Sequence, residues 1–162
     1  MIPAIPLLLP LAFVIPIPFF RPVLEHTNQG AWDELVAAFT LRGVSVSGDH
    51  PRCRERDLYG LYVRGSRRVV VCDRGDRSNT LRHEGWHLVQ SLCLGDRQWL
   101  EPAVIERRLS REERSELRLL SQPERWHREA EARTIARFSV KDYLQEMDKA
   151  CANTTSLRQR EP

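Results

Sequence analysis

Residues 80–94 read TLRHEGWHLVQSLCL, and this stretch decides how the rest of the chain must fold. It contains an H-E-x-x-H motif, present as HEGWH at positions 83–87. Side chains four positions apart share one face of an α-helix, so a helix here presents the imidazoles of His83 and His87 to a single ion. Neutral imidazole is a good zinc ligand, and a hydrolytic zinc site takes three protein ligands and keeps a fourth position for water. Glu84 would lean over that open position as the general base.

The residues around the motif favour a buried helix. Residues 78–80 (SNT) are N-cap types, and Gly95 stands where a helix commonly ends in the left-handed conformation. The two histidines and Gln90 share one side, and these polar groups need partners, which metal binding would supply. The alternative is a buried helix whose histidines have only protein partners. Gly85 costs ~1 kcal/mol relative to Ala in a helix, and its presence indicates the close approach of a neighbouring backbone.

Length and composition predict one soluble domain. The 162 residues are 41% apolar and 29% charged, which is typical of a globular protein long enough to bury a core. The net charge is only +3, and basic residues are scattered among acidic ones over positions 42–137, so no nucleic-acid binding is expected. We place the domain at residues 25–151, after an apolar, proline-rich segment at 1–24 and before a disordered tail at 152–162.

Residues 1–20 form an uncharged apolar run as long as a membrane span. Prolines at positions 3, 6, 10, 16 and 18 argue against a regular spanning helix, and the basic start and cleavage site of a signal peptide are not visible. The segment is an atypical export signal or anchor, an arm packed on the domain, or a stretch upstream of the true start codon. The first interpretation is favoured, which allows membrane association and an exported or membrane-tethered protein, with a cytoplasmic one as the alternative.

The four cysteines are even in number, as two disulfides in an oxidising compartment require. Ordinary buried thiols explain them equally well, and their spacing does not predict a pairing. They are Cys53, Cys72, Cys93 and Cys151.

The remaining patterns predict an α+β fold that is mainly helical. Two β-rich runs at 58–63 and 68–72 flank a short turn and predict an antiparallel hairpin beside the motif helix. An extended strand there can bind a peptide by adding it as a further strand, and a purely structural hairpin is the alternative. We also expect helices at 31–41, 103–109, 110–120, 121–137 and 139–150, capping boxes at 110–113 and 121–124, and a short extended segment at 44–47.

The third metal ligand has to come from elsewhere in the chain. Cys93 lies where the third histidine stands in the longer H-E-x-x-H-x-x-G-x-x-H pattern, but position 90 is Gln, so the helix should continue and carry Cys93 away. His127, Glu129 and Glu131 remain, all on one downstream helix. The two glutamates project about 200° apart, so only one can face the ion. Glu129 projects on an apolar side, where a carboxylate would need an ion, and Glu131 stays open as the alternative.

This arrangement resembles a known group. A helix with H-E-x-x-H, followed later in the chain by a helix bearing E-x-x-A, is similar to the gluzincin-type zinc metallopeptidases, especially the small single-domain forms. The resemblance implies a zincin-like fold, with the E-x-x-A glutamate, here Glu129, as the third ligand. The acidic or amide residue that commonly follows this motif is Arg133 here, which keeps Glu131 as the alternative. The stretch 53–137 is also similar to uncharacterised cyanobacterial and cyanophage proteins that share Cys53, G-x-Y at 60–62, Cys72 and L-R-H-E-x-x-H-x-x-Q at 81–90.

Together these features predict a zinc-dependent metallohydrolase, a peptidase acting on a peptide or protein substrate. His83, His87 and Glu129 would hold one Zn²⁺ ion. Glu84 would accept the proton of the attacking water and later deliver it to the leaving amine.

A donor for the developing oxyanion is also expected, and His127 or Tyr143 could serve.

Two other functions compete with that of a zinc peptidase. The first is a catalytically silent, zinc-stabilised binding module with the same ligands. The second is a membrane-associated protein without metal, built on residues 1–20.

Overall fold

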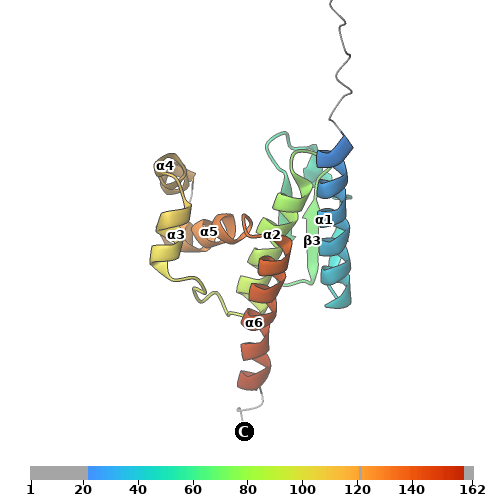
Figure 1. Ribbon diagram of the computed structural model, residues 1–162. Coiled ribbons are helices and arrows are strands. Elements are labelled where there is room, and N and C mark those ends of the chain that lie inside the picture. Colours follow the sequence, from blue (N-terminus) through green and yellow to red (C-terminus); the bar gives the residue numbers. More distant parts are fainter. Residues whose placement is uncertain (1–21, 121, 159–162) are drawn as a thin grey trace, which may run out of the picture.

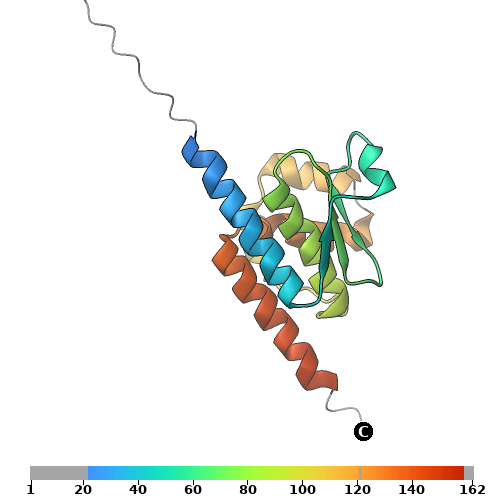
Figure 2. The same cartoon turned by 90° about the vertical axis from the view of Figure 1, so that its right-hand side faces the viewer.

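The computed structural model describes residues 22–120 and 122–158, and it has the predicted α+β fold with mainly helical content. The elements in chain order are α1 (Pro22–Leu41), β1 (Ser45–Ser47), the 3₁₀ helix η1 (Pro51–Arg54), β2 (Gly60–Val63), β3 (Arg68–Val71), α2 (Arg77–Leu92), α3 (Pro102–Arg108), α4 (Arg111–Leu120), α5 (Pro123–Ile135) and α6 (Val140–Arg158). Helix α2, which carries the motif, lies in the middle of the molecule, with α1 and the sheet on one side and α3 to α5 on the other (Figure 1). Helices α1 and α6 lie side by side along the same flank (Figure 2).

The sheet has three strands in the order β1-β3-β2. Strands β2 and β3 form the predicted antiparallel hairpin, with Leu61 opposite Val70. Strand β1 pairs with β3 in parallel, with Val46 opposite Val69, so the sheet is mixed and the expectation of a purely antiparallel one was wrong. The connection from β1 to β2 crosses to the other side of β3. The sequence of each strand predicts that it is extended but does not predict which strands pair or in which direction. Strand β2 is therefore an edge strand that lies next to α2.

Apolar side chains of α2 form the centre of the core. Leu81, Trp86 and Val89 are fully buried and belong to one cluster with residues of α1, β3 and α6. A Cβ atom at Gly85 would overlap the ring of Phe39 and lie 2.8 Å from the hydroxyl of Tyr143. The predicted close approach at this glycine is present, but it comes from side chains and not from a neighbouring backbone.

Side-chain capping decides where two of the helices begin. The N-cap of α2 is Asp76, whose carboxylate accepts a 2.9 Å hydrogen bond from the amide of Asn79, so the cap lies ahead of the predicted residues 78–80. The capping box before α4 is confirmed. The backbone amide of Glu113 donates to the hydroxyl of Ser110 at 3.1 Å, and the backbone amide of Ser110 donates to the carboxylate of Glu113 at 2.9 Å. The second predicted box does not start α5. That helix begins at Pro123 after the N-cap Gln122, and Ser121 lies outside the described residues.

The helices at the two ends are longer than predicted. Helix α1 starts at Pro22 instead of residue 31, since a single glycine such as Gly30 costs only ~1 kcal/mol and does not stop a helix. Helix α6 continues to Arg158, so residues 152–158 of the expected disordered tail are helical. In residues 22–120 and 122–158, no helix is long and apolar enough to cross a membrane. The segment 1–20, to which membrane association was assigned, lies outside the described residues.

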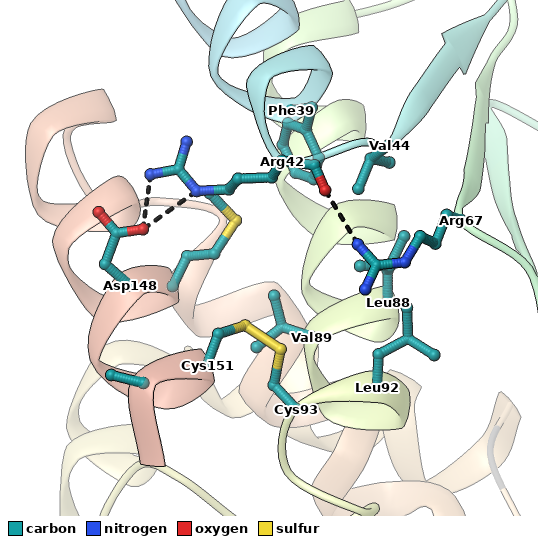
Figure 3. A pocket seen from close by; sticks show the side chains of 12 residues that line it. Phe39, Arg42, Val44, Arg67, Leu88, Val89, Leu92, Cys93, Asp148 and Cys151 are labelled. Carbon is teal, nitrogen blue, oxygen red and sulfur yellow. Dashed lines mark hydrogen bonds and ion pairs between the residues drawn. A yellow bond between two sulfur atoms is a disulfide. The ribbon is translucent and has the colours of Figure 1, made fainter. Parts of the chain in front are cut away.

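Two disulfides resolve the cysteine question. Cys53 is bonded to Cys72, which joins the η1 loop to the end of β3. Cys93 is bonded to Cys151, which joins the end of α2 to α6 beside a cavity of about 430 Å³ (Figure 3). Cys93 is therefore unavailable as a metal ligand, as the continuing helix predicts.

Candidate metal centre

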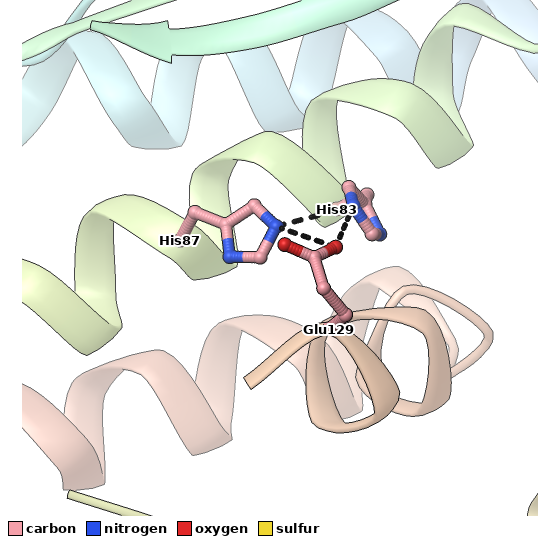
Figure 4. Close-up of side chains that lie close together, drawn as sticks. All are labelled: His83, His87 and Glu129. Carbon is pink, nitrogen blue, oxygen red and sulfur yellow. Dashed lines mark hydrogen bonds and ion pairs between the residues drawn. The ribbon is translucent and has the colours of Figure 1, made fainter. Parts of the chain in front are cut away.

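Three side chains from two helices converge beside α2. His83 and His87 lie one turn apart on α2, with their Nε2 atoms 3.2 Å from each other. Glu129 reaches them from α5, and its Oε2 atom lies 3.3 Å from His87 Nε2 and 3.6 Å from His83 Nε2 (Figure 4). One donor atom from each of these residues lies within 4.8 Å of the other two, so the group could hold a metal ion. The structure thus brings together the three residues predicted as ligands.

Glu131, the alternative third ligand, does not belong to this group. Its side chain is buried, and its carboxylate accepts four hydrogen bonds within the protein. The amides of Trp99 and Leu100 donate to Oε1 at 2.6 and 2.7 Å. The Trp86 indole and the Gln90 side chain donate to Oε2 at 3.0 and 2.8 Å.

The predicted reason for choosing Glu129 was wrong. Glu129 was assigned to the core-facing side of its helix, yet its side chain is 32% exposed, whereas Glu131 is only 1% exposed. The face of α2 that packs against α5 carries the polar groups of Trp86 and Gln90. Their hydrogen bonds stabilise the buried carboxylate of Glu131. A helical projection that treats every buried face as apolar therefore assigns the two glutamates the wrong way round.

Gln90 sets the tautomer of His87. The side-chain nitrogen of Gln90 donates to the Arg128 carbonyl at 3.0 Å and to Glu131 at 2.8 Å. These two acceptors fix the orientation of the amide, so its oxygen is the atom that lies 2.9 Å from His87 Nδ1. Because that oxygen can only accept, Nδ1 carries a hydrogen. In the neutral imidazole the lone pair on Nε2 therefore faces the cluster, and Nε2 donates to Glu129 only when the ring is protonated. The sequence predicts that Gln90 lies on the same side of the helix as the histidines. It does not predict the Arg128 carbonyl and the Glu131 carboxylate, which fix the orientation of the Gln90 amide.

The cluster perturbs the ionisation of its own members. Burial favours the neutral form of Glu129, but hydrogen bonds from His83 and His87 outweigh it and hold the pKa of the Glu129 carboxyl well below its usual range. Burial also favours neutral His87, but the contacts with Glu129 outweigh it and raise the pKa of His87. The contacts between Glu129 and the two histidines therefore outweigh the effect of burial on the pKa of Glu129 and on that of His87.

Glu84 is held by the edge strand. The Tyr62 amide points away from β3, and it donates to Glu84 Oε2 at 2.9 Å. No described group donates a hydrogen bond to the other oxygen of this carboxylate. Gly60 makes the close approach possible, since a Cβ there would lie 2.6 Å from Thr80 Cγ2, 2.7 Å from the Val70 carbonyl oxygen and 3.1 Å from Glu84 Cγ.

Two cavities meet at Gly60 and Glu84, which line both of them. The cavity of about 550 Å³ adjoins His83, and the one of about 530 Å³ adjoins His87 and Glu129. We refer to them as the His83 cavity and the His87 cavity. The candidate metal centre is therefore reachable from two directions along the β2 edge.

The residues suggested for stabilising an oxyanion line neither cavity. His127 is exposed, and its ring contacts Trp126 at a centroid distance of 4.8 Å. Tyr143 is fully buried near Gly85 and Trp86, and burial raises the pKa of its hydroxyl. The structure therefore does not bring either residue to the cluster, and the sequence does not show which side of α2 each residue occupies. The His87 cavity is lined instead by arginines that belong to no motif: Arg52, Arg64, Arg125 and Arg128.

Comparison of the chain with protein-family models, with curated proteins and with solved structures finds no match.

Proposed function

We propose that this protein is a zinc-dependent hydrolase that cleaves peptide bonds. The observation that carries the proposal is the convergence of two histidines and Glu129 next to Glu84, at the point where two cavities meet. A zincin-like relationship between this fold and the gluzincin peptidases is part of the same proposal, and it is supported by the order of H-E-x-x-H and E-x-x-A along the chain.

The donor set suits zinc. Two neutral imidazoles and one carboxylate are typical of catalytic zinc sites, whereas magnesium and calcium prefer oxygen ligands. Donors bound at 2.0–2.1 Å to a tetrahedral ion lie about 3.3 Å from one another. The separations of 3.2, 3.3 and 3.6 Å between the donor atoms of His83, His87 and Glu129 agree with that value.

Glu84 is the proposed general base. Zinc, when bound, supplies a Lewis acid that polarises a carbonyl group and lowers the pKa of water. Glu84 would accept the proton of the attacking water on the oxygen that the Tyr62 amide leaves free, and it would return the proton to the leaving nitrogen. The outward-facing backbone groups of β2 other than the Tyr62 amide, which is bonded to Glu84, would align the substrate, because such groups of an edge strand can pair with an extended peptide.

Metal analysis combined with a proteolysis assay tests the proposal. We expect about one zinc ion per chain in the wild type and in Glu84→Gln, and much less in Glu129→Gln. The wild type should cleave unfolded casein, and a chelator should stop the cleavage. Glu84→Gln should retain zinc and lose hydrolysis, so undiminished cleavage by that variant would refute the role of Glu84. If the wild type binds zinc, cleaves nothing and unfolds with chelator, the protein is a zinc-stabilised binding module instead.

A further inference from the structure

The two cavities beside the candidate metal centre differ in charge. The His83 cavity contains Asp57 and Asp76, while its two arginines are paired, Arg137 with Glu113 and Arg133 with Glu116. The His87 cavity is lined by four arginines, and apart from Glu84 and Glu129 its only acidic residue is Asp96. The cleft along β2 is therefore acidic at one end and basic at the other.

One carboxylate serves two of these arginines. Asp96 Oδ2 lies 3.2 Å from the Arg64 guanidinium, and Asp96 Oδ1 pairs with the Arg128 guanidinium. Asp96 by itself can balance only one of these two guanidinium charges.

Arg125 adds a further positive charge to the cavity. It is exposed in the first turns of α5, and no acidic side chain in the described part of the chain pairs with it. Arg52, the fourth arginine, is already neutralised by Glu55, with contacts of 2.8 and 3.0 Å. The surplus positive charge of the cavity therefore belongs to Arg64, Arg125 and Arg128.

We propose that the His87 cavity is a carboxylate subsite that binds an acidic group of a peptide, either an Asp or Glu side chain or a C-terminal carboxylate. The planar guanidinium presents paired donors that match the two oxygens of a carboxylate. Gly60 lines both cavities, so a peptide paired with β2 would extend from the metal centre into this basic end. The inference rests on the proposed function only for calling the peptide a substrate, since binding does not require hydrolysis.

Peptide binding by the zinc-loaded Glu84→Gln protein tests the subsite. Four fluorescent peptides share one sequence and differ at one position and at the C-terminus: Glu with an amidated end, Gln with an amidated end, Gln with a free carboxylate, and Lys with an amidated end. Anisotropy titrations at low salt should show roughly two- to fivefold tighter binding of a carboxylate-bearing peptide, which is the size expected for a partly exposed charged pair. The preference for the first or the third peptide identifies the source of the carboxylate.

Charge variants complete the test. Arg64→Gln and Arg125→Gln should each reduce the preference, and Arg118→Gln, at an exposed arginine of α4 that lines neither cavity, should leave it unchanged. Arg128 is kept because its guanidinium also donates to the His87 carbonyl at 3.0 Å. Equal binding of all four peptides, no binding of any, or a preference that survives both substitutions would overturn the subsite.

The wild-type protein separates this inference from the peptidase proposal. Hydrolysis of all four peptides at equal rates would overturn the subsite and leave the peptidase function intact. Arginine-dependent binding of carboxylate peptides without hydrolysis would overturn the peptidase function and leave the subsite intact.

Discussion

Replacing Glu131 by Gln should destabilise the fold far more than the same change at Glu129. Each oxygen of the Glu131 carboxylate accepts two hydrogen bonds, so an amide nitrogen at either position would face two donors. Two hydrogen bonds would be lost, and bonds to a charged group contribute about 1.5–3 kcal/mol each, so the expected loss is about 3–6 kcal/mol. That is a large part of the free energy of unfolding of a domain of this size, about 5–15 kcal/mol.

Urea denaturation of metal-free protein measures this loss directly. Glu129→Gln is the matched control, because it changes a carboxylate on the same helix that is 32% exposed and that, among the described residues, forms ion pairs only with the two histidines. We expect the control to bind metal poorly and, without metal, to keep most of the free energy of unfolding of the wild type. If Glu131→Gln is too unstable to purify, Trp86→Phe removes a single donor to the same carboxylate and should cost about 1–3 kcal/mol. A Glu131→Gln protein as stable as the control would refute the reasoning.

Three other predictions concern the core and the ligands. Gly85→Ala should lower the free energy of unfolding by about 1–3 kcal/mol, because the added Cβ would overlap Phe39. Gly30→Ala, with open space around it, should raise the free energy of unfolding by about 0.4–1 kcal/mol. Thermal melts compare the two variants, and equal effects would contradict the packing difference. Gln90→Leu should weaken zinc binding roughly 10–100-fold by releasing the His87 tautomer, measured by competition with a chromogenic chelator; unchanged affinity would exclude that role. Zinc affinity should begin to fall as the pH drops below the pKa of metal-free His87, which the contacts with Glu129 raise against the effect of burial, because a protonated imidazole cannot bind metal. Affinity that stays constant until the pH reaches the range of carboxyl groups would show that Glu129 controls the pH dependence instead.

The local part of the structure could be predicted from the sequence. The motif helix, the hairpin and the capping box at Ser110 each depend on residues within a few positions of one another, and all three are present. The parallel pairing of β1 could not be predicted, because it depends on the path of the chain around β3. The ends of α1 and α6 were also missed, since a helix can continue through a single unfavourable residue when its neighbours favour it.

The candidate site shows the same division. Spacing alone places His83 and His87 on one face of a helix, and E-x-x-A points to Glu129 through its resemblance to known zinc peptidases. The burial of Glu131 could not be predicted, because a carboxylate in the core is stable only when donors from distant residues surround it.

The pair of imidazoles on α2 and the identity of the neighbouring acid follow from the sequence alone, because helical periodicity is a property of adjacent residues. The packing of the helices was needed to show which glutamate lies beside the histidines, how Gln90 orients His87 and where the arginines gather. These features join residues that are far apart in the chain, and their distances are set by how the helices pack and not by any local pattern.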